Sequence, residues 1–332
     1  MTVYNQSESN GRSKRIYTKL STDSVAGINK QAVGDEIWET DTGKKYVWNA
    51  TPDTTSGLWI QKESRGLPIS TDPFIEVAKG NVFSLTFGNL PNVDEFLVHK
   101  FGRNAAVPNG SWAFVNNLGF TGWPLSQPRA VRIKAGGNAN DTAAGTGARE
   151  ITIQGIGVIS GTEEATETIT TAGASASAIT TELWYRIHRA WVSSAGTYGA
   201  ANTGAITIEE NIGGTNLIKI EVEEGQTQFA GYTIPLGYTA YLLSLHVTVD
   251  GLKPADIRLF TRADILDYTT APFASKRLRL YFDGISGSFN YTPKSPEFSI
   301  PALSDIWVEA QGSGALTEVS ANFELLLVRD IP

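Results

Sequence analysis

Histidine and serine side chains are the first place to look for catalysis in this sequence. The three histidines, His99, His188 and His246, lie far apart, and no Gly-x-Ser-x-Gly motif supplies a serine nucleophile. A histidine-rich metal site needs at least two histidines at ligand spacing, which this sequence lacks. We therefore predict that each histidine lies on a solvated or half-buried strand face and takes no part in catalysis.

Acidic clusters could supply the carboxylate pair of a glycosidase. Nothing in their spacing sets one carboxylate against another, so solvated loops and strand faces are the competing interpretation. On this ground a β-sandwich glycosidase or depolymerase ranks last among the functions considered. The clusters are Glu163, Glu164 and Glu167, and Glu221, Glu223 and Glu224.

Cofactor and metal sites also find little support in the sequence. The oxygen donors Asn138, Asn140 and Asp141 could hold Ca²⁺, but their spacing matches no EF-hand, and a turn-rich loop is the alternative. Neither Gly-x-Gly-x-x-Gly nor a P-loop motif is present. The chain has no cysteine, which excludes disulfides and thiolate chemistry. We therefore expect no catalytic residues, no cofactor, no metal and no enzymatic activity.

Tryptophan offers a possible binding surface of another kind. Trp112 and Trp123 flank a glycine-rich stretch, residues 116–122, and could form a platform for a host glycan. Tryptophan serves as commonly as a buried anchor in a core or an interface. Both interpretations remain open from the sequence.

Strands are the elements that must position these residues. Apolar residues alternate with polar ones in several segments, which indicates antiparallel sheets with one solvated side. With glycine-rich turns and no βαβ pattern, this predicts an all-β fold, an antiparallel β-sandwich or jelly roll. A short helix over residues 256–267 is the one helical expectation. The predicted single-face sets are Ile218, Ile220 and Val222; Tyr241, Leu243, Leu245, Val247 and Val249; and Phe323, Leu325 and Leu327.

Three regions are expected along the chain. Residues 1–33 are predicted to be an extended basic arm, with Arg12, Lys14 and Arg15 as docking candidates. Residues 34–68 read as a β-hairpin module and linker. Residues 69–332 are predicted to form the sandwich or jelly-roll region, either as one unit or as two β subdomains divided near residue 125. The hairpin module carries three further interface candidates, Trp38, Trp48 and Trp59.

Charge and hydropathy bear on partners and location. The net charge is −7, which argues against nucleic-acid binding except through the basic arm. The first residues are polar, so we expect no secretory signal. The most apolar stretch, residues 238–249, is too short to span a bilayer. We expect a protein made in the cytoplasm, with no membrane partner.

Several sequence blocks in one order resemble a family of structural (virion) proteins of marine and environmental tailed bacteriophages. The resemblance covers roughly residues 100–328, and residues 34–59 are separately similar to a tryptophan-bearing hairpin of phage virion proteins. The chain departs from the family at residues 156–161, where the family has a more polar loop. The blocks are NANDTAAGTGAR (138–149), ITIQG (151–155), TETIT (166–170), YRIHRA (185–190), SAG (194–196), NTGAITI (202–208), residues 226–241 and IPALSDI (300–306).

This resemblance implies a component of a virus particle, assembled in the host cytoplasm. The expectation is a capsid decoration or cement protein, a homotrimer that contacts the major capsid protein. The alternatives are a tail-fibre or spike receptor-binding protein, which would bind host glycan, and a major capsid protein with a double jelly roll.

Overall fold

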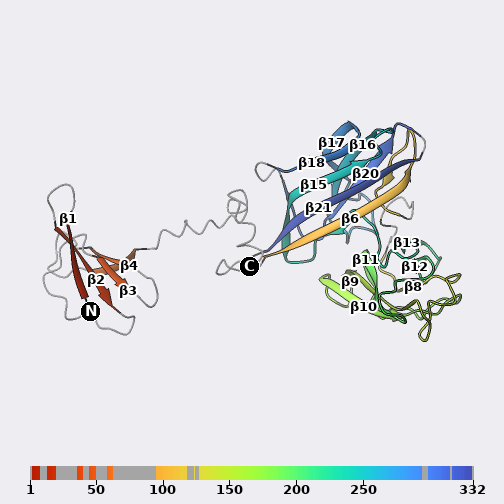
Figure 1. Ribbon diagram of the computed structural model, residues 1–332, viewed down its shortest axis with the longest axis horizontal. Coiled ribbons are helices and arrows are strands. Elements are labelled where there is room, and N and C mark those ends of the chain that lie inside the picture. The colour runs from red at the N-terminus through yellow and green to blue at the C-terminus, as the bar shows by residue number, and fades with distance from the viewer. Residues whose placement is uncertain are drawn as a thin grey trace. The chain divides into compact units, whose positions relative to one another are not determined.

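The computed structural model describes the backbone of five strands within residues 2–62, and residues 95–117, 123, 127–293, 298–314 and 316–330. The chain divides into two compact units, residues 1–71 and 72–332. Each unit has sheets of its own (Figure 1).

The first unit is a five-stranded sheet with the order β1-β2-β3-β4-β5. The predicted meander is present as its last three strands, and Trp48 and Trp59 are partners across the antiparallel β4–β5 pair. Trp38 lies in β3, opposite Lys45. The strands are β1 Thr2–Ser7, β2 Ser13–Lys19, β3 Glu36–Glu39, β4 Lys45–Asn49 and β5 Leu58–Lys62.

The described strands within residues 1–33 are part of a sheet, whereas an extended basic arm was expected. β1 and β2 pair with each other, and β2 continues the sheet by pairing in parallel with β3. A three-stranded meander is barely stable by itself, and the two added strands enlarge it to five strands. Lys14 and Arg15 therefore lie in a paired strand, while Arg12 lies outside the described residues.

The second unit is built around a jelly roll. One sheet has the order β18-β15-β21-β6 and the other β14-β20-β16-β17, with short strands β19 and β7 added to β15 and β20. Successive strands pass between the two sheets in the manner of two Greek keys, as in jelly rolls. The expected antiparallel sandwich is confirmed. The strands are β6 Glu95–Val107, β7 Ala113–Phe114, β14 Gly231–Thr233, β15 Tyr238–Val249, β16 Ala255–Arg262, β17 Arg277–Ile285, β18 Gly287–Tyr291, β19 Ser299–Ile300, β20 Asp305–Gly312 and β21 Thr317–Arg329.

One jelly-roll strand is interrupted by an insertion. β7 and β14 pair with the same edge of β20 in the same direction, β7 at residues 309–310 and β14 at residues 305–307. Between them, Val115 N donates to Val308 O and Val308 N donates to Ala230 O, each at 3.0 Å. The chain thus leaves the strand after Val115 and returns to it at Ala230. We call residues 117–228 the inserted module, so the second β region predicted to begin near residue 125 is nested inside the jelly roll.

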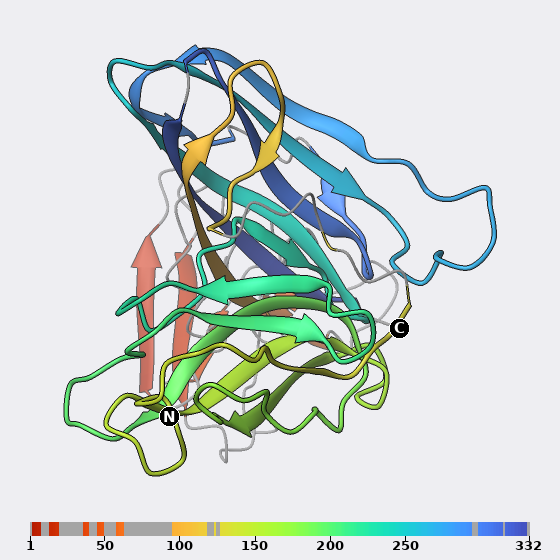
Figure 2. The same ribbon diagram turned by 90° about the vertical axis from the view of Figure 1, so that its right-hand side faces the viewer.

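The inserted module contains two three-stranded sheets, β10-β9-β11 and β13-β12-β8. In Figures 1 and 2 its green strands gather on one side of the long jelly-roll strands. It has a separate core that centres on Trp184, Ile151 and Ile208. The strands are β8 Val131–Ile133, β9 Ala148–Gly157, β10 Glu164–Thr170, β11 Trp184–Ala195, β12 Ile206–Glu210 and β13 Asn216–Ile220.

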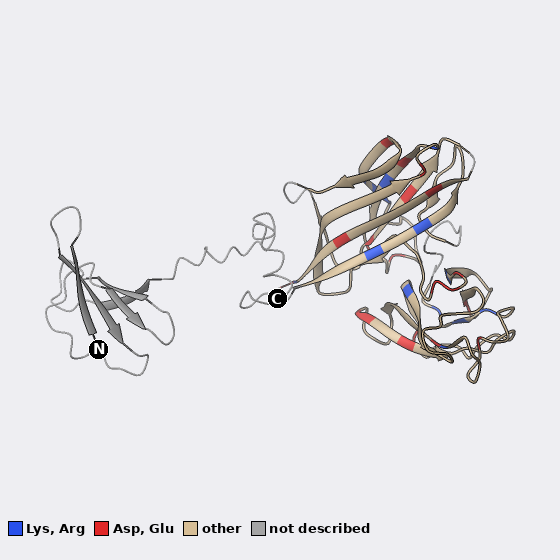
Figure 3. Ribbon diagram, in the orientation of Figure 1, with Lys and Arg blue, Asp and Glu red and all other residues tan. Residues whose placement is uncertain are grey.

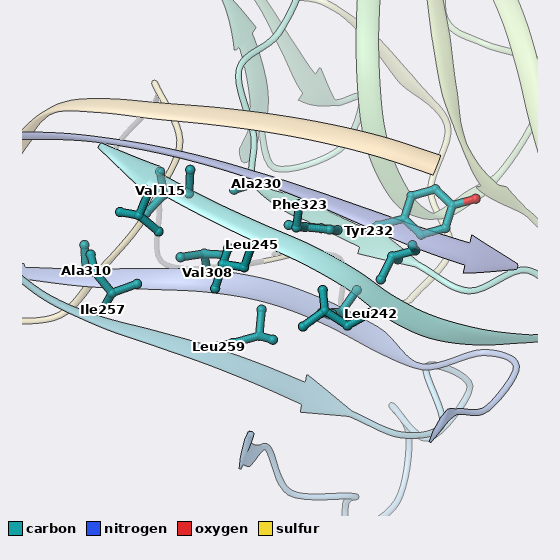
Figure 4. Packing of buried hydrophobic residues seen from close by; sticks show 14 of the residues in the cluster. Val115, Ala230, Tyr232, Leu242, Leu245, Ile257, Leu259, Val308, Ala310 and Phe323 are labelled. Carbon is teal, nitrogen blue, oxygen red and sulfur yellow. The ribbon is translucent and has the colours of Figure 1, made fainter. Parts of the chain in front are cut away.

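The jelly-roll core lies between its two sheets, as alternation in the sequence predicted. Phe323, Leu325 and Leu327 of β21 are all fully buried. Figure 4 shows Leu242 and Leu245 of β15 among side chains of the facing sheet. Because apolar residues at every second position face inward, one row from each strand fills the space between the sheets.

The alternation fails in part of β15, where a β-bulge changes the face. Residues 240 and 242 are buried before the bulge, and residues 245, 247 and 249 are buried after it. The register shift lies between Leu242 and Ser244. An extra residue on one strand exchanges inward and outward positions. The prediction that Tyr241 and Leu243 share a face with Leu245 is therefore wrong.

The helix expected at residues 256–267 is also absent, because residues 255–262 form β16 between β17 and β20. Val222, expected to extend the face of β13, is 51% exposed because β13 ends at Ile220. Within the described residues, no helix is long and apolar enough to cross a membrane. Figure 3 shows Lys, Arg, Asp and Glu positions spread over several of the described strands.

Candidate functional site

Buried polar side chains meet where the inserted module contacts the jelly roll. β6 and β14 approach from the jelly roll, and β10 and β11 from the inserted module. A cavity of about 240 Å³ opens there, lined by residues 96–100 of β6 and by Glu164, His188 and Tyr232. We refer to it as the junction cavity.

Lys100 is the central cation of the junction cavity. Its side chain leaves β6 and is 7% exposed, and its Nζ donates a hydrogen bond of 2.8 Å to the backbone O of His188. Burial, helped by the positive charge of Arg189, lowers the pKa of Lys100 to about 7. The amine is therefore divided between its charged and neutral forms near neutral pH.

His188 lies beside Lys100 on β11 and is 1% exposed. Neither Nδ1 nor Nε2 has a hydrogen-bond partner, and the ring lies 4.5 Å, centroid to centroid, from the ring of Tyr232. Burial lowers the pKa of His188 well below its ordinary value, and the positive charges of Lys100 and Arg186 act in the same direction. The imidazole is accordingly neutral at neutral pH.

Glu164 and Tyr232 also line the junction cavity. The Tyr232 hydroxyl donates to Glu164 Oε1 at 3.2 Å. Burial raises the pKa of Glu164, and burial together with the Glu164 carboxyl raises the pKa of Tyr232 well above its usual range. A desolvated carboxyl, a phenol, an imidazole and an amine thus surround one small space, the kind of grouping that marks a candidate functional site.

A buried ion pair fixes the two parts beside this cavity. Arg186 of β11 approaches Asp305 of β20, with Nη2 and Oδ2 3.1 Å apart and side chains only 4% and 2% exposed. Asp305 Oδ1 also accepts a 2.8 Å hydrogen bond from Thr233 Oγ1. The pair ties the inserted module to β20 and, through Thr233, to β14.

Of the two predicted glycan contacts, Trp123 is an anchor of this junction. Its ring centroid lies 5.2 Å from that of Phe229 and 5.9 Å from that of Trp307, and Arg186 lies 5.8 Å from it. Trp112 packs against a different residue, with the Arg258 guanidinium 3.4 Å from its ring centroid. The anchor interpretation therefore fits Trp123, whose ring packs against other aromatic rings.

The loop that suggested Ca²⁺ is organised around a carboxylate that already has partners. Asp141 is 3% exposed, and its two oxygens accept 2.8 Å hydrogen bonds from the backbone N–H groups of Ala148, Thr203 and Gly204. Asn138 Oδ1 accepts from the backbone N of Asn140. These oxygens face N–H donors, so the turn interpretation holds. No group of three or more acidic or histidine residues suited to a metal occurs among the described residues.

The acidic clusters are also dispersed among structural contacts. Glu167 accepts from the backbone N–H groups of residues 181 and 182, and Glu221 pairs with Lys219 at 2.7 Å. Glu224 accepts from Gln228. Only Glu164 faces the junction cavity. Of the histidines, only His188 does so as a buried group, whereas His99 is exposed and His246 contacts Ser288.

Sequence reasoning did not single out Lys100 or Tyr232. Lys100 belongs to no motif, and Tyr232 lies in the block of residues 226–241 without having been considered for chemistry. The insertion brings both together with His188 and Glu164. The signals in the sequence were weak: a lysine between His99 and Phe101 in β6, and the basic residues on either side of His188. Neither indicates a cavity without knowledge of which strands meet.

Comparisons with known proteins give little more. No protein-family model and no curated protein matches the sequence. Among solved structures, a chain of infectious bursal disease virus strain Gx aligns over 77% of this chain and 76% of that chain, at 10% identity and TM-score 0.20. A chain of T=1 particles derived from that virus aligns over 78% of this chain and 75% of that chain, at 10% identity and TM-score 0.18. A chain of its VP2 subviral particle aligns over 78% of both chains, at 10% identity and TM-score 0.17. Scores this low do not show a common fold, so the jelly-roll assignment rests on the strand order above.

Proposed function

We propose that this protein is a non-enzymatic structural component of a virus particle, and specifically a decoration or cement protein on a bacteriophage head. The observation that carries the proposal is the jelly roll of residues 95–330, an architecture used by viral capsid domains and also by lectins. The sequence blocks that resemble phage virion proteins lie in this same unit. The two lines of support are independent, since strand order does not depend on motif similarity.

The division into two units fits a protein that attaches to a larger assembly. The sheet of residues 1–71 forms a body of its own, and we propose that it docks on the major capsid protein. Its arginines and tryptophans, including Arg15, Trp38, Trp48 and Trp59, are residue types enriched at interfaces, and Lys14 adds a positive charge. The jelly roll would then form the outer part of a homotrimer.

The structure offers no double jelly roll to support a major capsid protein. The described residues contain one jelly roll, and the inserted module consists of two three-stranded sheets. That alternative predicted two jelly rolls, so it is not carried further.

A tail-fibre or spike protein remains the second candidate, because one groove suits a saccharide. The groove has a volume of about 560 Å³ and is lined by the amides of Asn104, Asn117 and Gln228 and by Arg103. Amide side chains both donate and accept hydrogen bonds, which matches sugar hydroxyl groups. The proposed ligand is a host-surface glycan.

The position and copy number of the protein in purified particles test these proposals. Mass spectrometry would establish presence and copy number, and gold-labelled antibody against the purified chain would locate it. Many copies spread over the head support the decoration role, whereas a few copies at the tail support the spike. Absence from the particles would refute both. A molar mass of three times 35.8 kDa, measured for the purified protein by sedimentation, would support the trimer.

A further inference from the structure

We propose that the junction cavity is a binding site for a small oxyanion, a carboxylate or a phosphate, held by Lys100 and His188. This inference does not depend on the role of the protein in a particle. It rests on an incomplete set of polar contacts among the groups that line this cavity.

Lys100 supplies hydrogen-bond donors that the protein leaves unused. An ammonium group has three N–H donors, and among the described residues the only acceptor bonded to Nζ is the backbone O of His188. Within the described part of the chain, no carboxylate oxygen comes within 4.0 Å of this nitrogen. Buried lysines are usually paired. A bound oxyanion would supply the missing counter-ion and accept the remaining hydrogens.

His188, which also lines the cavity, carries a second donor that the described residues leave unused. Its ring is buried and lacks a hydrogen-bond partner at either nitrogen. A neutral imidazole always carries one N–H, and leaving it unpaired in a buried place is unfavourable. An anion bonded to Lys100 would lie among the groups lining the same space.

Glu164 is the one lining group that opposes an anion. Its carboxyl accepts a hydrogen bond from Tyr232, and burial raises its pKa, which favours the uncharged acid. The uncharged acid carries an O–H donor and repels an anion less. Arg189, exposed at the rim, adds a positive charge that attracts anions from solvent. The volume of about 240 Å³ suits a ligand of a few heavy atoms with water.

Calorimetric titration of the full chain with sodium acetate and, separately, sodium phosphate would test the site at constant ionic strength set with chloride. We expect saturable binding of at least one probe, and the stronger probe identifies the preferred oxyanion. Binding should tighten as the pH falls from 8 to 6, because the charged form of Lys100 binds the anion. Lys100→Met should weaken binding on the order of tenfold or more.

Two variants serve as comparisons. Lys253→Met removes a lysine outside the cavity and should leave the affinity unchanged, whereas Glu164→Gln removes the opposing carboxylate and should tighten binding. An unaltered affinity in Lys100→Met would refute the proposal, as would failure of both probes to bind.

A measurement on the unaltered protein covers the case in which Lys100→Met does not fold. Acetylation of individual lysines by a trace reagent, read by mass spectrometry, should slow at Lys100 but not at Lys253 when the preferred oxyanion replaces chloride. Equal slowing at both lysines, or none at Lys100, would overturn the assignment.

Discussion

The jelly roll and the inserted module are both built from strands, but their buried backbone N–H and C=O groups find hydrogen-bond partners in different ways. In the jelly roll, β6 and β21 each extend over 13 residues and β15 over 12, and they pair along most of their length. In the inserted module, β8 has three residues, and β12 and β13 have five each. More of its chain therefore lies in loops, whose buried N–H groups need other partners.

Carboxylate and amide side chains supply those partners in the inserted module. Asp141 accepts from three backbone N–H groups, and Glu182 accepts from those of Ile159, Ser160 and Leu183. Asn202 donates to two backbone oxygens and accepts from Gly225. The jelly-roll core, by contrast, is a continuous set of apolar side chains. Long ladders stabilise one region, and a few polar side chains fasten the loops of the other.

Substitutions at the contact between the two regions should lower the free energy of unfolding most, and Asp305→Ala tests this. Removing this carboxylate leaves the Arg186 charge buried without its partner, so we expect a loss of about 3–5 kcal/mol in the free energy of unfolding. Urea denaturation would measure it. Glu318→Gln breaks the exposed pair with Arg103 and should cost about 0–1 kcal/mol. Similar losses in both variants would contradict the buried-pair argument.

The close approach of β6 to the interrupted strand can be broken with Gly102→Ala. A Cβ at this position would lie 2.2 Å from both Val115 O and Ala230 N, which are backbone atoms. We expect a loss of about 2–3 kcal/mol by overpacking, again by urea denaturation. Gly251→Ala is the control, since its Cβ meets nothing within 4 Å. If Gly102→Ala were as stable as the control, the strands would not approach this closely.

Asp141→Asn tests whether side-chain hydrogen bonds to backbone N–H groups stabilise the loops of the inserted module. An amide cannot accept hydrogen bonds at both of its polar atoms, so at least one buried N–H loses its partner, at a cost of about 1–3 kcal/mol. Hydrogen exchange should quicken at residues 148, 203 and 204 but not in β15 or β21. Asp264→Asn, at an exposed turn, is the matched control. Equal quickening in the jelly roll would mean that the two regions do not differ in this way.

The smallest expected effect is on pH dependence at the junction. Because the pKa of His188 is lowered in the folded protein, the unfolded chain binds more protons below about pH 6.5, and stability falls as the pH falls. Between pH 7 and 5.5 this group should contribute a loss of about 1 kcal/mol. His188→Phe should remove that part of the dependence, whereas His246→Gln should retain it. Thermal unfolding at both pH values would measure the difference, and equal slopes in the two variants would contradict the prediction.

Much of the fold could be predicted from local pattern. Phe323, Leu325 and Leu327 face the core because their spacing matches the pleat of a strand, and Trp48 and Trp59 lie in strands that turn-forming residues delimit. The exceptions have specific causes. The bulge after Leu242 reverses the faces of β15, and pairing with β17 and β20 makes residues 255–262 a strand.

The candidate site could hardly be predicted at all. Lys100, Glu164, His188 and Tyr232 come from four strands, and the sequence separation of Lys100 and Tyr232 is set by the insertion between them. Only His188 and Glu164 drew notice as residue types, and each was expected to be a solvated or half-buried surface group. Their burial depends on which strands pack together.

By itself, the sequence determined the class of the fold, because period-two alternation and the position of turns are local properties that many of the strands display. The tertiary structure alone decided which residues could act together, because the meeting of β6, β10, β11 and β14 depends on where one jelly-roll strand is interrupted. The histidines and acidic clusters that the sequence offered for catalysis thus fall into two groups. Most of those described make structural contacts or lie exposed, and His188 and Glu164 line the junction cavity. That division follows from long-range packing, which adjacent residues do not encode.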